Sequence, residues 1–176
     1  MYWEETIELI KKYGEEPKST YPHPYSESDD YEVYLYERGT FKTKYIPIED
    51  FPENIKDNIK KYLKYDLTDL QLFSSLGASE GFGVHDDPDD VLIICLEGEI
   101  SYVVEKYHGF TAQEDAYIKN DPVILKPGDT IFIQKGLKHM GISSTVPRIC
   151  LSCGGARNVP KEEVTHYFGS GYRTKI

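Results

Sequence analysis

Two histidines and an aspartate are placed where they could bind a single metal ion. His85 and Asp87 stand two residues apart ahead of an apolar run, and His139 ends a second motif, PGDTIFIQKGLKH. In an extended strand, side chains two residues apart point to one face, so His85 and Asp87 can converge on one cation. If His139 returns on a neighbouring strand, two imidazoles and one carboxylate share one side of the metal. The open positions would accept a substrate and dioxygen, which predicts a mononuclear iron enzyme.

The acids around His85 also have a plainer interpretation, as an exposed acidic turn. The segment HDDPDD follows a glycine-rich lead-in, GASEGFG, and such composition is typical of a surface loop. Asp86 and Asp89 fit that interpretation, and we expect them to face solvent. For His85 and Asp87 the second motif favours a metal site, because it ends in the further histidine, His139, that such a site needs.

Short strands separated by turns are expected to position these residues. They are rich in Ile, Val, Leu and Tyr, and Gly, Pro or Asp stands between them. We predict strands over 69–75, 91–96, 99–105, 122–125, 130–134 and 146–153. A series of this kind predicts a mainly β fold, a small antiparallel barrel or jelly roll.

The chain before these strands is predicted to add peripheral N-terminal helices and a hairpin. Apolar residues at helical spacing predict one helix over 2–14 and another over 50–64, with Asp50 as its cap and Pro52 in its first turn. Two alternating runs, YEVYLY and FKTKYIPI, flank a Gly-containing turn and predict the hairpin.

The two motifs resemble the metal-binding segments of JmjC-type and ribosomal-oxygenase-like cupins. HDDPDDVLIICLEGE is similar to the first segment of that family, and PGDTIFIQKGLKH is similar to the second. The resemblance covers residues 66–158 and implies a double-stranded β-helix, the cupin jelly roll, that depends on Fe(II) and 2-oxoglutarate. It also implies that His85, Asp87 and His139 are the catalytic metal ligands and that Asp90 lies behind them or faces the substrate.

One position departs from the family's pattern. JmjC-type enzymes usually place a lysine or arginine on the strand after the Glu-Gly turn to hold 2-oxoglutarate, and Ile100 stands at the matching position. Arg148 is a substitute, because a guanidinium fork matches a carboxylate bidentately. We take Arg148 and Tyr102 as the candidate cosubstrate-binding residues. The alternative is that Arg148 faces water while the residues alternating with it face the core, and strand parity leaves both open.

Length and charge bound the class of protein. The chain of 176 residues has the size of one structural domain, which we divide into an N-terminal part (1–65), a β core (66–158) and a C-terminal extension (159–176). A net charge of -10 repels phosphate backbones, so we expect no direct nucleic-acid binding. The longest apolar run, 91–96, is too short to span a bilayer, and the start lacks a signal-peptide pattern. We therefore expect a cytoplasmic protein without a membrane partner.

The three cysteines lie inside apolar runs, and their odd number argues against a disulfide framework of the secreted kind. Cys150 and Cys153 form a CxxC, but in a strand these two positions point to opposite faces. No second CxxC exists to complete a zinc site. We interpret Cys95, Cys150 and Cys153 as buried strand residues.

Three functions are compatible with these features. The first is an Fe(II)- and 2-oxoglutarate-dependent oxygenase of the hydroxylase type, acting on a protein side chain or a small molecule. The second is a metal-dependent cupin enzyme without 2-oxoglutarate, which Ile100 favours. The third is a non-catalytic cupin that serves as a binding module. Cupins often pair through their sheets, so a homodimer is compatible with all three by analogy.

Overall fold

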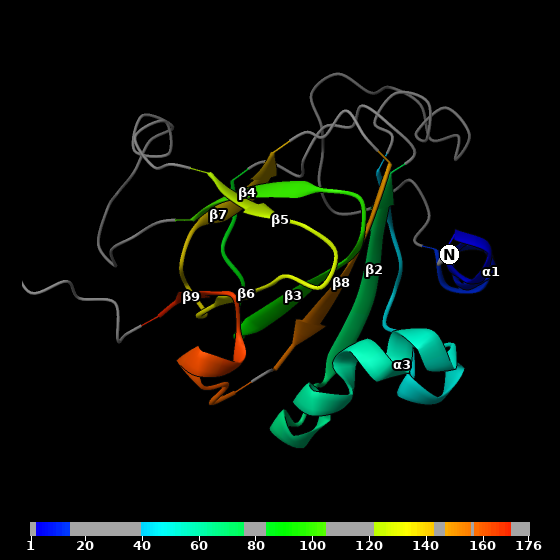
Figure 1. The fold of residues 1–176 in the computed structure, drawn as a ribbon, viewed down its shortest axis with the longest axis horizontal. Coiled ribbons are helices and arrows are strands. Elements are labelled where there is room, and N and C mark those ends of the chain that lie inside the picture. The colour runs from blue at the N-terminus through cyan, green and yellow to red at the C-terminus, as the bar shows by residue number, and fades with distance from the viewer. Residues whose placement is uncertain are drawn as a thin grey trace, which may run out of the picture.

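Two β-sheets with helices on one side make up the fold (Figure 1). The structure is a computed structural model, and it describes residues 3–14, 40–75, 84–104, 122–142, 147–155 and 157–169. The larger sheet has the strand order β1-β2-β8-β3-β6-β9, and the smaller has the order β5-β4-β7. Neighbouring strands pair antiparallel, except β6 and β9, which pair parallel. The mainly β fold class predicted from the sequence is confirmed.

The strands are β1 (Thr40–Lys42), β2 (Asp69–Ser75), β3 (Val91–Glu97), β4 (Ile100–Val104), β5 (Val123–Leu125), β6 (Thr130–Ile133), β7 (His139–Ile142), β8 (Arg148–Gly154) and β9 (His166–Phe168). The six predicted strands correspond to β2, β3, β4, β5, β6 and β8. Sequence patterning missed β7 and β9, because β7 contains a glycine without regular alternation and β9 is very short.

The larger sheet is buried on both faces, which explains why β3 is apolar along almost its whole length. One face packs against helices and forms the helix-side core, which includes Ile55, Ile59, Tyr62, Leu72, Leu92, Ile94, Ile149, Leu151 and Cys153. The other face packs against the smaller sheet and forms the inter-sheet core, which includes Ile93, Cys95, Ile100, Tyr102, Ile131 and Cys150. All three cysteines are buried, as predicted.

The helices are α1 (Trp3–Tyr13) and α3 (Glu53–Ile59), with 3-10 turns η1 (Ile48–Asp50), η2 (Lys60–Tyr65) and η4 (Lys161–Glu163). α1 is confirmed as an amphipathic helix, and it is tied to the chain after β1 by a 2.7 Å hydrogen bond from Lys44 N to Tyr13 O. The second helix begins later than predicted, because Pro52 is extended and stands just before it. Asp50 ends η1 and does not cap α3; its carboxylate instead contacts Lys12 and Tyr13.

The predicted hairpin lies partly outside the described residues, since 31–36 are not among them. Its second run supplies β1, which pairs along the edge of the sheet with β2. The following residues continue along that edge, where Thr43 N donates to Leu72 O at 3.0 Å and Ile46 N donates to Leu70 O at 2.9 Å. The run therefore closes one edge of the larger sheet.

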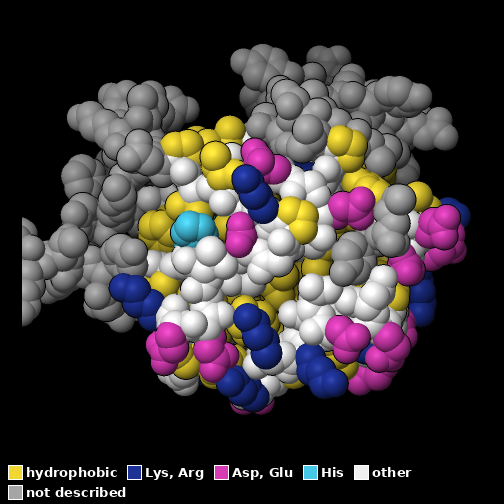
Figure 2. All heavy atoms as spheres, in the orientation of Figure 1, with side chains coloured by type: hydrophobic (Ala, Val, Ile, Leu, Met, Phe, Trp, Pro, Cys, Tyr) yellow, Lys and Arg dark blue, Asp and Glu magenta, His cyan; other side chains and the backbone are white. Residues whose placement is uncertain are grey.

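The surface of the described part of the chain carries charges of both signs. Figure 2 shows acidic side chains beside lysine and arginine side chains on one face. None of the described helices is long and apolar enough to cross a membrane.

Candidate metal centre

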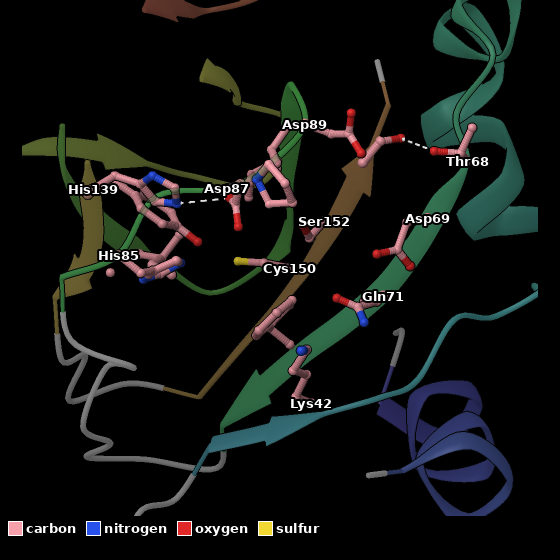
Figure 3. Close-up of a pocket in the computed structure, with 18 of the residues that line it drawn as sticks. Lys42, Thr68, Asp69, Gln71, His85, Asp87, Asp89, His139, Cys150 and Ser152 are labelled. Carbon is pink, nitrogen blue, oxygen red and sulfur yellow. Dashed lines mark hydrogen bonds and ion pairs between the residues drawn. The ribbon is translucent and has the colours of Figure 1, made fainter. Parts of the chain in front are cut away.

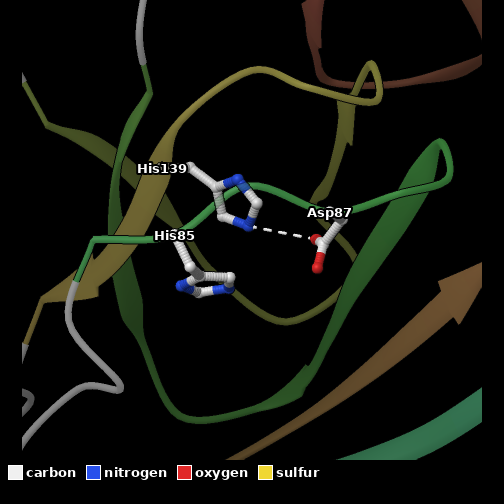
Figure 4. A group of neighbouring side chains, drawn as sticks. All are labelled: His85, Asp87 and His139. Atoms are coloured by element: carbon white, nitrogen blue, oxygen red, sulfur yellow. Dashed lines mark ion pairs between the residues drawn. The ribbon is translucent and has the colours of Figure 1, made fainter. Parts of the chain in front are cut away.

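His85 and His139 are placed side by side by the backbone. His85 N donates to His139 O at 3.0 Å, and His139 N donates to His85 O at 2.8 Å, which makes an isolated antiparallel bridge. Directly opposite residues of an antiparallel pair point to the same side. The two ring centroids lie 4.4 Å apart (Figure 4). Backbone pairing therefore places the two imidazoles next to each other on the same side.

Asp87 completes the group. It stands two residues after His85, and its Oδ2 lies 3.3 Å from Nε2 of His139 (Figure 4). One ligand atom from each of the three side chains lies within 4.8 Å of the others. The structure thus brings together all three residues that the sequence singled out as candidate ligands.

The turn between β6 and β7 is tied to the segment that carries Asp87. Gly136 N donates to the backbone oxygen of Asp87 at 3.0 Å, and Lys135 N donates to Oδ1 of Asp90 at 2.9 Å. Asp90 therefore fastens this turn, and the turn leads directly into His139. These two bonds fix the position of His139 relative to Asp87.

A further hydrogen bond orients the ring of His139. Its Nδ1 donates to the backbone oxygen of Leu137 at 3.0 Å, since a carbonyl can only accept. Nδ1 therefore carries a proton, and Nε2 is the ring nitrogen that faces Asp87. The side chain of His139 is 3% exposed, so its orientation is also held by packing.

The surroundings of Asp87 favour its charged form. Burial acts to raise the pKa of Asp87, but the hydrogen bond with His139 and the nearby His139, His85 and Lys42 outweigh it. The net effect holds the pKa of Asp87 below its usual range. A carboxylate is thus available as a ligand at neutral pH.

The three donors are of the types that bind a divalent metal ion of the first transition row. Metal–nitrogen and metal–oxygen bonds of about 2.1 Å at right angles separate neighbouring donors by about 3 Å. The observed 3.3 Å between Asp87 Oδ2 and His139 Nε2 is close to that value. Two imidazoles and one carboxylate on one side of the ion are the ligand set typical of non-haem Fe(II) sites.

A cavity of about 170 Å³ opens beside these residues (Figure 3). Its wall on the larger sheet is made by alternate residues of two paired strands, which share one face of the sheet. They include Asp69, Gln71, Phe73, Arg148, Cys150 and Ser152. The candidate metal ligands form part of the same cavity lining.

Arg148 lies in the wall of this cavity and is 5% exposed. The residues alternating with it, Ile149, Leu151 and Cys153, belong to the helix-side core. The face of β8 that carries Arg148 lines the cavity and lies opposite the smaller sheet, so Arg148 does not face bulk water. Its Nε donates to Ser75 Oγ at 3.1 Å, across the β2–β8 register.

Two residues of β4 line the cavity beside Arg148. Ile100 is 4% exposed and brings no charge to the position where a cation was expected from the family pattern. Tyr102 is 9% exposed, and burial raises its pKa well above the usual range. Its hydroxyl therefore keeps its proton at neutral pH and can donate a hydrogen bond.

Sequence analysis did not single out several polar residues that line the cavity. Asp69, Gln71 and Ser152 belong to this group, and Ser75 contacts Arg148 behind it. The signal was the alternation of polar and apolar residues along 69–75, which indicates one polar face. It could not show that this face points into a cavity.

Gly98, in the turn between β3 and β4, lets that turn approach the start of β8 closely. Its φ is +77°, and a Cβ at this position would lie 2.1 Å from Pro147 O and 2.9 Å from Arg148 Cα. Gly128 has a φ of +91°, and no described atom lies within 4 Å of a Cβ built there. The two glycines therefore differ in crowding but share the left-handed backbone.

We expect Gly98→Ala to lower the free energy of unfolding by about 1–3 kcal/mol more than Gly128→Ala does. Both substitutions place a Cβ on left-handed backbone, at about 1–2 kcal/mol, and only Gly98→Ala adds the steric clash. Urea unfolding of the two variants measures the difference. Equal losses would contradict the close approach of this turn to Arg148.

Comparison with known proteins matches the chain to a protein family and to solved structures. The model of the JmjC domain family matches residues 44–163, which is more than half of the chain. A search of curated protein sequences gave no significant match. The sequence resemblance to JmjC-type cupins is confirmed by the family match.

Solved structures also resemble the chain. The ribosomal oxygenase YcfD from Escherichia coli aligns with a TM-score of 0.50 at 21% identity, covering 70% of this chain and 33% of that chain. The values are the same for YcfD in complex with cobalt and 2-oxoglutarate. A cupin superfamily protein from Desulfitobacterium hafniense aligns at 17% identity and a TM-score of 0.39, covering 51% of this chain and 67% of that chain.

The alignments with YcfD show a shared fold, the double-stranded β-helix of the cupins. The chain spans about a third of the YcfD structures. With its two facing sheets and the match over residues 44–163, the chain belongs to the JmjC domain family.

Proposed function

We propose that the chain is an Fe(II)- and 2-oxoglutarate-dependent oxygenase of the hydroxylase type, which acts on a protein side chain or a small molecule. The observation that carries the proposal is the convergence of His85, Asp87 and His139 at a cavity that also contains a buried arginine, Arg148. The YcfD structure with cobalt and 2-oxoglutarate supports this pairing of ligands in a protein of the same fold.

In this proposal His85, Asp87 and His139 hold the metal. Iron and 2-oxoglutarate together would supply the activation of dioxygen for insertion into a C–H bond. The bond from His139 Nδ1 to Leu137 O directs Nε2 toward the metal position, and the lowered pKa of Asp87 keeps its carboxylate ionised at neutral pH. The bridge between His85 and His139 keeps the two imidazoles at a fixed separation.

Arg148 is the proposed anchor for the distal carboxylate of 2-oxoglutarate. A guanidinium group offers two parallel donors to a carboxylate, and burial strengthens such a pair. The bond from its Nε to Ser75 Oγ limits how the guanidinium group can rotate. The protonated hydroxyl of Tyr102 would supply a further donor from the facing sheet.

One observation favours the second candidate, a metal-dependent cupin enzyme that does not use 2-oxoglutarate. Ile100 is buried where JmjC-type enzymes usually place a cation, and it lines the cavity. In this case the substrate would bind the metal directly. The cavity would then need no carboxylate anchor, and changes at Arg148 would leave metal-dependent turnover intact.

The test is an anaerobic titration of the Fe(II)-loaded protein with 2-oxoglutarate, followed by admission of air. We expect a weak visible charge-transfer band on binding and slow formation of succinate afterwards. Stoichiometric iron without a band would overturn the role of 2-oxoglutarate and leave the direct-binding enzyme. Failure to bind iron would identify a non-catalytic cupin.

A further inference from the structure

We propose that Cys95 and Cys150 form a redox-active dithiol in the cavity wall, which hydrogen peroxide oxidises reversibly to a cross-strand disulfide. The proposed oxygenase function uses neither thiol. The inference rests on strand register, backbone hydrogen bonding and the cavity, and it stands whether or not the chain uses 2-oxoglutarate.

The two cysteines face each other across neighbouring strands. Cys95 of β3 and Cys150 of β8 are direct partners in the antiparallel register. Direct partners point to the same face of a sheet, and both side chains belong to the inter-sheet core. Both are free thiols, and they are 0% and 1% exposed.

The backbone hydrogen bonds show which type of pair this is. Cys95 N donates to Asp129 O at 3.0 Å, and Cys95 O accepts from Gly128 N at 2.8 Å. Both backbone groups of Cys95 are thus directed away from β8. Cys95 and Cys150 therefore form a non-hydrogen-bonded pair, in which the side chains lie closest.

The spacing of such a pair suits a disulfide. The Cα atoms of a non-hydrogen-bonded pair lie about 4.5 Å apart, and disulfides join Cα atoms roughly 4.4–6.8 Å apart. The bond can therefore form without moving the strands apart. A separation at the short end of that range strains the bond, and strained disulfides are the more readily reduced.

The two thiols influence each other's pKa. A hydrogen bond with Cys150 is the largest influence on the pKa of Cys95 and lowers it, while burial opposes that effect. The same hydrogen bond and burial raise the pKa of Cys150, and they outweigh the positive charge of Arg148. Cys95 is therefore the thiol of the pair that loses its proton more readily, and the thiolate is the nucleophile.

An oxidant can reach the pair through the cavity. Cys150 lines the cavity, and Figure 3 shows its sulfur pointing away from β8 into that space. In the first step the Cys95 sulfur forms a bond to one peroxide oxygen as the O–O bond breaks, giving a sulfenic acid and water. The Cys150 sulfur then attacks the Cys95 sulfur, and the second oxygen leaves as water. Two thiols and one peroxide thus become one disulfide and two waters.

Cys153 provides an internal control in the same strand. It lies in the helix-side core on the opposite face of β8 and is 0% exposed. Burial raises its pKa, so it stays a thiol at neutral pH. The proposal predicts that Cys153 remains reduced while the other two react.

The test treats the full chain, freed of redox-active iron by a chelator, with stoichiometric hydrogen peroxide, followed by denaturation and alkylation. We expect one alkylated thiol, at Cys153, a mass lower by two hydrogens before alkylation, and recovery of all three thiols with dithiothreitol. Peptide mapping should give a Cys95–Cys150 linkage. Retention of three free thiols, or sulfinic acid on Cys95 with Cys150 still reduced, would overturn the proposal.

Two variants separate this chemistry from a loss of folding. Cys150→Ala should leave Cys95 as a sulfenic acid that dimedone traps, because the resolving thiol is gone. Cys153→Ser should form the same disulfide as the unmodified chain. A disulfide in Cys150→Ala, or equal dimedone labelling with and without Cys150, would contradict the assigned roles.

Discussion

Replacing Asp87 with alanine is expected to weaken Fe(II) binding by at least about 100-fold while the protein stays folded. Loss of residues that merely orient metal ligands already lowers metal affinity by 10- to 100-fold, and removal of a ligand has a larger effect. Asp87 supplies the carboxylate, and its backbone bond from Gly136 remains in the variant. Its side chain is 31% exposed, so we expect a stability change under about 1 kcal/mol.

Isothermal titration with Fe(II) under argon measures this effect, and thermal unfolding of the metal-free variant reports its stability. Asp86→Ala is the matched control, because Asp86 is exposed and adjacent but is not part of the candidate metal group. It should bind iron like the unmodified chain. Equal affinities of Asp87→Ala and Asp86→Ala would remove Asp87 from the metal site.

Replacing Arg148 with methionine is expected to weaken 2-oxoglutarate binding by roughly 30- to 1000-fold without changing iron affinity. Truncating one partner of a buried charged pair costs about 2–4 kcal/mol. Methionine has a similar volume, and removing a buried charge in this way is often neutral for stability. The lost bond to Ser75 Oγ should lower the free energy of unfolding by about 1 kcal/mol.

The amplitude of the visible band against 2-oxoglutarate concentration measures this loss. Lys42→Met is the matched control, since Lys42 is the other lysine or arginine among the described residues lining the cavity. Arg148→Lys should fall between the two, because it keeps the charge and loses the two-pronged geometry. If Lys42→Met abolished the band and Arg148→Met did not, the anchor would be Lys42.

The sequence was sufficient to predict which three residues form the candidate metal group. The spacing of His85 and Asp87 requires only the alternation of an extended segment, and His139 needed only to lie opposite them. The sequence did not predict strand β7, which begins at His139 and contains Gly141. Its position comes from pairing with β4, a contact between distant segments that local patterning does not encode.

The position of Arg148 shows a similar limit. Alternation in β8 correctly separates Ile149, Leu151 and Cys153 from the face that carries Arg148. Whether that second face meets water or protein depends on the smaller sheet, which covers it. Burial of both faces of one sheet is a property of the assembled layers, so no single strand could reveal the surroundings of Arg148 or its bond to Ser75.

The bridge between His85 and His139 makes metal affinity depend on a local opening equilibrium. The two amides of this bridge exchange with solvent only when it opens, so their protection reports the fraction of chains that hold both imidazoles in place. The apparent dissociation constant is the intrinsic constant divided by that fraction. A substitution far from the ligands that frays this bridge would therefore weaken metal binding in proportion, without altering a single ligand atom.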